Sequence, residues 1–129
     1  MNLPLKNVYN DHLLEHYHHP RNKGILENPS LSSGVYNPSC GDSVSVQARV
    51  EDGKIKEAKF QATGCVISCA AASMIIDLCV GKTVDEIVAY DKNTMLGLLK
   101  IELGPNRLRC GLLALEAFHN GIREYQKGQ

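Results

Sequence analysis

The spacing of apolar residues is helical at the start of the chain and becomes irregular after about twenty residues. Apolar and aromatic side chains recur at helical spacing over residues 5–18, and His19-Pro20 interrupts the pattern, which predicts an amphipathic N-terminal helix. Residues 22–38 are rich in Gly, Asn, Ser and Pro. They predict loops, with at most one short strand near residues 33–36.

The next two segments alternate between apolar and polar residues. The alternation covers residues 43–50 and 54–60, and Glu51-Asp52-Gly53 lies between them. Alternation on both sides of a Gly-containing turn predicts an antiparallel hairpin with one buried face. Together with the preceding short strand, the hairpin predicts a small antiparallel three-stranded sheet.

The pattern after Gly64 predicts only helices. Cys65 to Val80 is Ala-rich and strongly apolar and is followed by Gly81, which predicts a buried helix beginning at Cys65. Thr83 and Glu86 form a capping-box pattern for a short helix. Two further helices are predicted, one over residues 91–103 before Gly104-Pro105 and one from about Arg109 to Tyr125.

This order of elements predicts an α+β fold. We expect residues 1–129 to form one compact domain, in which an N-terminal helix and the small antiparallel sheet pack against several C-terminal helices. A chain of this size buries enough surface to form a core without disulfides.

Charge and the N-terminal sequence exclude several classes of function. The chain has 14 Lys plus Arg against 14 Asp plus Glu, so neither nucleic acid nor an anionic membrane is an expected partner. Residues 1–6 lack the features of a secretory signal, and no later segment reaches the length of a membrane span. We therefore expect a cytoplasmic protein.

Cysteine is the residue type that points to chemistry. In a reducing compartment, five free thiols indicate metal, redox or sulfur chemistry rather than disulfides. Cys40 lies in a turn, and Cys65 and Cys110 are expected to open helices, where the helix dipole favours the thiolate. Gly41 permits a tight turn that brings the Asp42 carboxylate towards the Cys40 thiol.

Three thiolates and a carboxylate would suit tetrahedral zinc or an iron–sulfur cluster. The cysteines are 25 and 45 positions apart, unlike the close pairs of a zinc ribbon. From spacing alone, a metal site at Cys40, Asp42, Cys65 and Cys110 and a scatter of core cysteines remain open alternatives.

The remaining cysteines and the histidines have plainer interpretations. Cys69 follows Cys65 by one helical turn and could reach the same site, but a core position is the favoured interpretation. Cys79 is expected to fill the core. His12 and His16 have the spacing of a metal-binding pair, but a polar helix end is favoured for them and for His18 and His19.

Three of the cysteines lie in three motifs: Asn37-Pro38-Ser39-Cys40-Gly41-Asp42, Gly64-Cys65 before an Ala/Ser-rich helix, and Arg109-Cys110. These motifs resemble those of the U-type iron–sulfur cluster assembly scaffolds, the family of IscU, SufU and the NifU N-terminal domain. The resemblance also includes His19-Pro20-Arg21-Asn22 and covers nearly the whole chain.

The resemblance implies that Cys40, Asp42, Cys65 and Cys110 converge at one exposed end and bind zinc or a nascent [2Fe–2S] cluster. It implies a scaffold rather than an enzyme. A cysteine desulfurase would deliver sulfur as a persulfide, iron and electrons would complete the cluster, and acceptor apo-proteins would receive it. Asp42 would be the weak, exchangeable ligand.

Two departures leave the branch of the family open. Arg109 replaces the His of IscU-type members and cannot ligate a metal while protonated. An Arg there resembles SufU, which implies the alternative of a zinc-dependent sulfur acceptor with persulfide on Cys40 or Cys110, although the SufU insertion is absent. Leu103-Gly104-Pro105-Asn106-Arg107 replaces the chaperone-binding motif, so recruitment of a dedicated chaperone also stays open.

Overall fold

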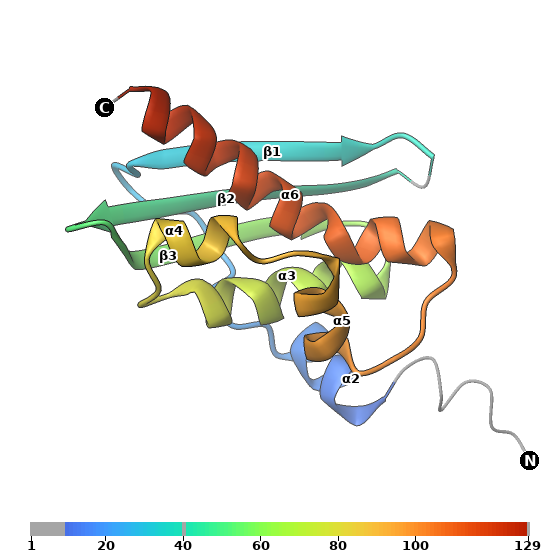
Figure 1. Cartoon of the computed structure of the whole chain (residues 1–129). Coiled ribbons are helices and arrows are strands. Elements are labelled where there is room, and N and C mark those ends of the chain that lie inside the picture. Colours follow the sequence, from blue (N-terminus) through green and yellow to red (C-terminus); the bar gives the residue numbers. More distant parts are fainter. Residues whose placement is uncertain (1–9, 40, 129) are drawn as a thin grey trace, which may run out of the picture.

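The structure, a computed structural model, describes residues 10–39 and 41–128. Within these ranges three strands and five helices follow one another (Figure 1). They are α2 (Asp11–His18), β1 (Leu31–Asn37), β2 (Asp42–Glu51), β3 (Lys54–Thr63), α3 (Val66–Cys79), α4 (Val84–Val88), α5 (Lys92–Leu99) and α6 (Pro105–Lys127).

The sheet is antiparallel, with β2 between β1 and β3. Along β2, the buried Val44, Val46 and Ala48 alternate with more accessible polar residues. Because successive strand side chains point to opposite faces, this alternation places one face against the helices. The predicted hairpin is confirmed, and the strand expected near residues 33–36 is longer, at Leu31–Asn37.

Two long helices cover the apolar face of the sheet. α6 crosses β1 and β2 in Figure 1, and α3 packs beside α6 and against β3. α3 is buried along most of its length because α2 packs on its other side. The large core side chains include Phe60, Ile75 and Phe118. The predicted α+β architecture is therefore confirmed.

Three helix boundaries differ from the sequence predictions. α2 begins at Asp11, because Asn10 is extended and its side chain accepts a hydrogen bond from the Leu13 N–H. The earlier part of the predicted helix, residues 5–9, lies outside the described residues. α5 ends at Leu99 rather than 103, because Lys100 adopts a left-handed conformation with φ of 58°.

The last helix begins four residues earlier than predicted. Gly104-Pro105 does not separate α6 from the preceding chain but starts it, with Gly104 as the N-cap and Pro105 as the first helical residue. Proline is well suited to this position, because its φ is fixed at a helical value and the N–H that it lacks would have no partner. Cys110 is consequently displaced from the helix terminus.

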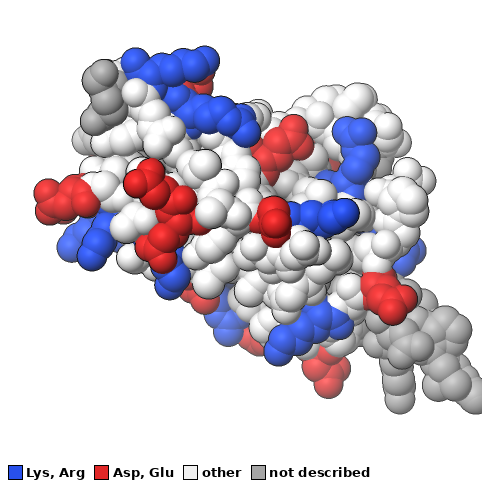
Figure 2. Space-filling view, in the orientation of Figure 1, with Lys and Arg blue, Asp and Glu red and all other residues white. Residues whose placement is uncertain are grey.

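Charged side chains of both signs lie on the surface (Figure 2). Figure 2 shows Lys and Arg interspersed with Asp and Glu on this side of the molecule. Of the helices in residues 10–39 and 41–128, none combines the length and apolar character required to cross a membrane.

Candidate functional site

Strand alternation directs Asp42 towards the helices. Asp42 is the first residue of β2 and has the same parity as Val44 and Val46, so its side chain lies on the helix-covered face. The side chain is only 1% exposed. A carboxylate buried to this degree requires hydrogen-bond donors around it.

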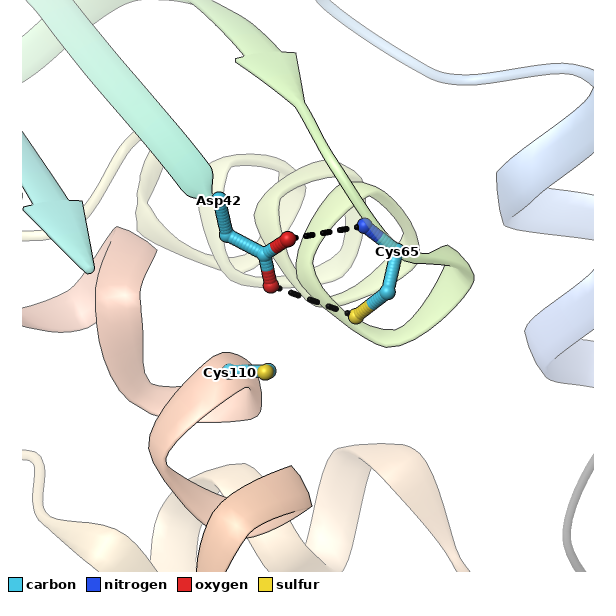
Figure 3. Close-up of side chains that lie close together, drawn as sticks. All are labelled: Asp42, Cys65 and Cys110. Carbon is cyan, nitrogen blue, oxygen red and sulfur yellow. Dashed lines mark hydrogen bonds between the residues drawn. The ribbon is translucent and has the colours of Figure 1, made fainter. Parts of the chain in front are cut away.

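Cys65 supplies two of these donors. It is the N-cap of α3, and its side chain does not cap its own helix. Instead, its backbone N–H donates to Asp42 Oδ1 at 3.0 Å, and its Sγ lies 3.3 Å from Asp42 Oδ2 (Figure 3). The carboxylate therefore satisfies a donor at the start of α3 and lies beside the thiol.

Ser68 is a further donor that the sequence analysis missed. Its hydroxyl is buried, donates to Asp42 Oδ2 and lies 3.4 Å from Cys65 Sγ. The signal was present in the sequence: Ser68 is the third residue of the helix after Cys65, a position from which side chains commonly reach back to the helix N-terminus.

Gly64 leaves the space that Asp42 occupies. A Cβ at this position would lie 2.0 Å from Asp42 Oδ1, and the residue has φ of 128°. Gly64 is thus the residue that permits both the turn from β3 into α3 and the close approach of the carboxylate.

Cys110 reaches the site from α6. It is 5% exposed and is the sixth residue of the helix that begins at Pro105. Only the first turn of a helix has unpaired N–H groups, so the expected thiolate stabilisation by a helix N-terminus does not apply to Cys110. Cys65 does lie at a helix N-terminus, as the N-cap of α3.

One ligand atom from each of Asp42, Cys65 and Cys110 lies within 4.8 Å of the others. The structure thus brings together three of the four residues singled out from the sequence, from the start of β2, the start of α3 and the second turn of α6. Cys40, the fourth, lies outside the described residues.

A surface cavity of about 610 Å³ leads to these residues. Its lining includes Cys65 and Cys110, Ser39, and the two exposed arginines Arg107 and Arg109. The expectation of an exposed site needs correction, because Asp42 and Cys110 are buried and Cys65 is the partly exposed member. Access is through the cavity.

Cys69 lies neither in the core nor in the group formed by Cys65 and Cys110, the two places considered from the sequence. It is partly exposed rather than a core residue, so the favoured interpretation is wrong. Among the described cysteines it is also not in the group formed by Cys65 and Cys110. It lines a second cavity, of about 460 Å³, together with Lys23 and Gly64. Burial, and after it the neighbouring Cys65, raises the pKa of the Cys69 thiol.

The prediction for Cys79 is confirmed, because its side chain is fully buried in the core. This burial raises the pKa of its thiol to about 12. Cys79 is therefore a protonated, apolar core residue at neutral pH.

The polar-end interpretation holds for three histidines and is wrong for the fourth. His12, His18 and His19 are exposed, whereas His16 is buried and its Nδ1 lies 2.8 Å from Ser73 Oγ. Burial lowers the pKa of His16, and Arg21 and His12 add to this. Within residues 10–39 and 41–128, no histidine belongs to a group of three candidate metal ligands.

Comparison with known proteins gives matches along most of the chain. The sequence model for the NifU-like N terminal domain matches residues 8–129. The mitochondrial iron sulfur cluster assembly protein 1 of Debaryomyces hansenii is 37% identical over 131 residues, which cover 98% of this chain and 72% of that protein.

One further relative is named as a scaffold protein and another as a sulfurtransferase. The iron–sulfur cluster assembly scaffold protein IscU 1 of Archaeoglobus fulgidus is 31% identical, with 92% of this chain and 76% of that protein covered. The zinc-dependent sulfurtransferase SufU of Bacillus subtilis is 30% identical, with 98% and 97% covered.

A solved structure has the same fold. The N-terminal NifU-like protein of Brucella abortus superposes with a TM-score of 0.81 at 23% identity, covering 97% of this chain and 99% of that one. At this identity the likeness concerns the fold alone.

Proposed function

Because the chain belongs to the NifU-like N-terminal domain family of U-type scaffold proteins, we propose that it is a scaffold on which a [2Fe–2S] cluster is assembled and from which the cluster passes to acceptor apo-proteins. The cluster is cargo, and the chain turns over no small substrate. We further propose that residues 1–129 act as a single scaffold domain.

The observation that carries this proposal is the convergence of Asp42, Cys65 and Cys110. Their ligand atoms lie within 4.8 Å of one another, and donors on a tetrahedral zinc ion with bonds of 2.0–2.3 Å are about 3.3–3.8 Å apart. Small side-chain shifts would therefore suffice for zinc or iron. Thiolates favour both over magnesium and calcium, and Cys40 is the proposed fourth ligand.

Anaerobic reconstitution tests the scaffold function. The protein is incubated with ferrous iron, cysteine, a reductant and a cysteine desulfurase, and visible absorption and circular dichroism are recorded. We expect [2Fe–2S] bands in the parent protein and in Cys69→Ser. Cys65→Ser and Cys110→Ser should lose them. The absence of bands from the folded parent protein would refute the proposal.

A second function is favoured by Arg109, which lines the cavity at the position that is His in IscU-type scaffolds. The alternative is a zinc-dependent sulfur acceptor, in which zinc holds the site and Cys40 or Cys110 takes persulfide sulfur from the desulfurase. Mass spectrometry after reaction with a desulfurase and cysteine, with and without zinc, distinguishes the two. A stable single-sulfur adduct without cluster formation would favour the sulfur acceptor.

The proposed partners follow from this chemistry. They are a cysteine desulfurase and acceptor apo-proteins, and the proposed compartment is the cytoplasm. Recruitment of a dedicated chaperone is not part of the proposal. The segment Leu103 to Arg107 departs from the chaperone-binding motif. The last three residues of this segment form the first turn of α6.

A further inference from the structure

Ser68 is placed between two of the proposed ligands. Its hydroxyl donates to Asp42 Oδ2, and the same oxygen lies 3.4 Å from Cys65 Sγ. The side chain is 1% exposed, so its contacts are with protein groups. A serine hydroxyl has a single proton to donate, and Ser68 can therefore serve the carboxylate or the sulfur, one at a time.

The Asp42 carboxylate also accepts hydrogen bonds from the start of α3. Oδ1 accepts the Cys65 N–H at the start of α3, and Oδ2 is shared by the Ser68 hydroxyl and Cys65 Sγ. If Oδ2 moves away from Ser68 to bind an ion, the Ser68 hydroxyl needs another acceptor, because a buried unpaired hydroxyl is unfavourable. A metal-bound Cys65 has lost its proton, so its sulfur is an acceptor within reach.

We propose that Ser68 is a positioning residue of this site. Its hydroxyl holds Asp42 in place when the carboxylate is not a ligand, and it donates to Cys65 Sγ when the carboxylate binds the ion. The buried hydroxyl is then paired in both arrangements, which allows Asp42 to join and leave the ion without leaving a donor unsatisfied. This inference rests on the proposed metal-binding function.

The test uses Co²⁺ and Zn²⁺ binding to the full chain, without desulfurase or cluster. Loss of a hydrogen-bonding partner of a metal ligand commonly costs about 10–100-fold in affinity. We expect Ser68→Ala to weaken Co²⁺ affinity at least tenfold and to change the visible d–d bands, which report on the ligand geometry. The sulfur-to-cobalt charge-transfer bands should persist because the thiolates remain. Ser68→Thr, which retains a hydroxyl, should recover most of the affinity.

Ser73 is the matched control for a merely structural effect. It is a second buried serine of α3, and its hydroxyl is hydrogen-bonded to His16 and to the Arg21 N–H. Ser73→Ala should lower thermal stability while Co²⁺ affinity stays within about twofold of the parent protein. Circular dichroism and thermal unfolding of each metal-free variant verify that the compared proteins are folded.

A double substitution isolates the role assigned to Ser68. In an Asp42→Ala background, Ser68→Ala should change Co²⁺ affinity much less than it does in the parent protein, because its partner is gone. Equal losses in the two backgrounds, an equal loss in Ser73→Ala, or parent-like affinity in Ser68→Ala would each overturn the inference. Failure of cluster reconstitution, in contrast, would refute the scaffold function and leave these metal affinities measurable.

Discussion

Replacing Gly64 with alanine would place a methyl group inside the hydrogen-bonded cluster at the start of α3. The new Cβ would lie 2.0 Å from Asp42 Oδ1, 2.6 Å from its Cγ and 2.9 Å from its Cα. Rotation of the Asp42 side chain could relieve the first two contacts. The third involves backbone, so β2 or the β3–α3 connection must also shift.

Two contributions set the expected loss of stability. An alanine with a strained positive φ costs of order 1–3 kcal/mol, and loss of a side-chain cap at a helix N-terminus costs about 0.5–2 kcal/mol. Together they predict that the free energy of unfolding of metal-free Gly64→Ala falls by roughly 1.5–5 kcal/mol. Each kcal/mol lowers Tm by roughly 4 °C at this chain length.

Two other glycines separate these contributions. Gly81 has φ of 90°, and a Cβ there would meet nothing within 4 Å, so Gly81→Ala measures backbone strain alone. A Cβ at Gly97, within α5, also meets nothing, and Gly97→Ala should be neutral or stabilise by about 0.5–1 kcal/mol. Urea unfolding of the three metal-free variants gives the comparison.

Coupling to Asp42 is the decisive measurement. Gly64→Ala should cost less in an Asp42→Ala background, because the displaced carboxylate is absent. If Gly64→Ala costs no more than Gly81→Ala, or costs the same with and without the Asp42 carboxylate, the role given to Gly64 is wrong.

Three further predictions use the acid–base and ligand properties of single residues. Because the folded pKa of His16 is lowered, protonation favours the unfolded chain, so stability should fall as pH decreases from about 6.5 through the lowered pKa. Urea unfolding from pH 5 to 8 should show this fall in the parent protein and less of it in His16→Gln. Identical pH profiles for the two proteins would contradict the lowered pKa of His16. Alkylation of the native protein at pH 8, followed by mass spectrometry, should modify Cys69 and spare Cys79, whose pKa is about 12; labelling of Cys79 at the rate of Cys69 would show that the core opens locally. Asp42→Ala should slow cluster transfer to an acceptor apo-protein, measured by circular dichroism, and unchanged transfer kinetics would remove Asp42 as the exchangeable ligand.

The sequence pattern was sufficient to predict the sheet and most of the helices. Alternation over residues 43–50 and 54–60 reflects a sheet with one buried face, and the Thr83 capping box is present as predicted. Local signals failed at Pro105, which can either end one helix or begin the next. Which of these occurs depends on how α6 packs on α3 and the sheet, and the local sequence does not specify that packing.

The candidate site was predictable in its members and not in its environment. Cys65 and Cys110 stood out by residue type, and the parity of Asp42 with Val44 would have placed its carboxylate on the buried face. The partial exposure of Cys69 depends on how α2 and β3 lie beside α3, and the contact of Ser68 with Asp42 depends on how β2 meets the start of α3. The place of Ser68 in the first turn of α3 is a local signal, but its partner Asp42 comes from a distant segment and leaves no local pattern.

Asp42, Cys65 and Cys110 come from segments that are distant in sequence and meet only after the sheet, α3 and α6 have assembled. A chain that has formed its hairpin alone would present scattered ligands of low affinity, so an ion bound at the proposed site would stabilise only the completed fold. Each tenfold rise in free metal above Kd would then add about 1.4 kcal/mol to the stability of the folded state. Metal loading and removal should therefore shift resistance to proteolysis across the whole chain, and the folded lifetime of the protein would follow the supply of metal in its compartment.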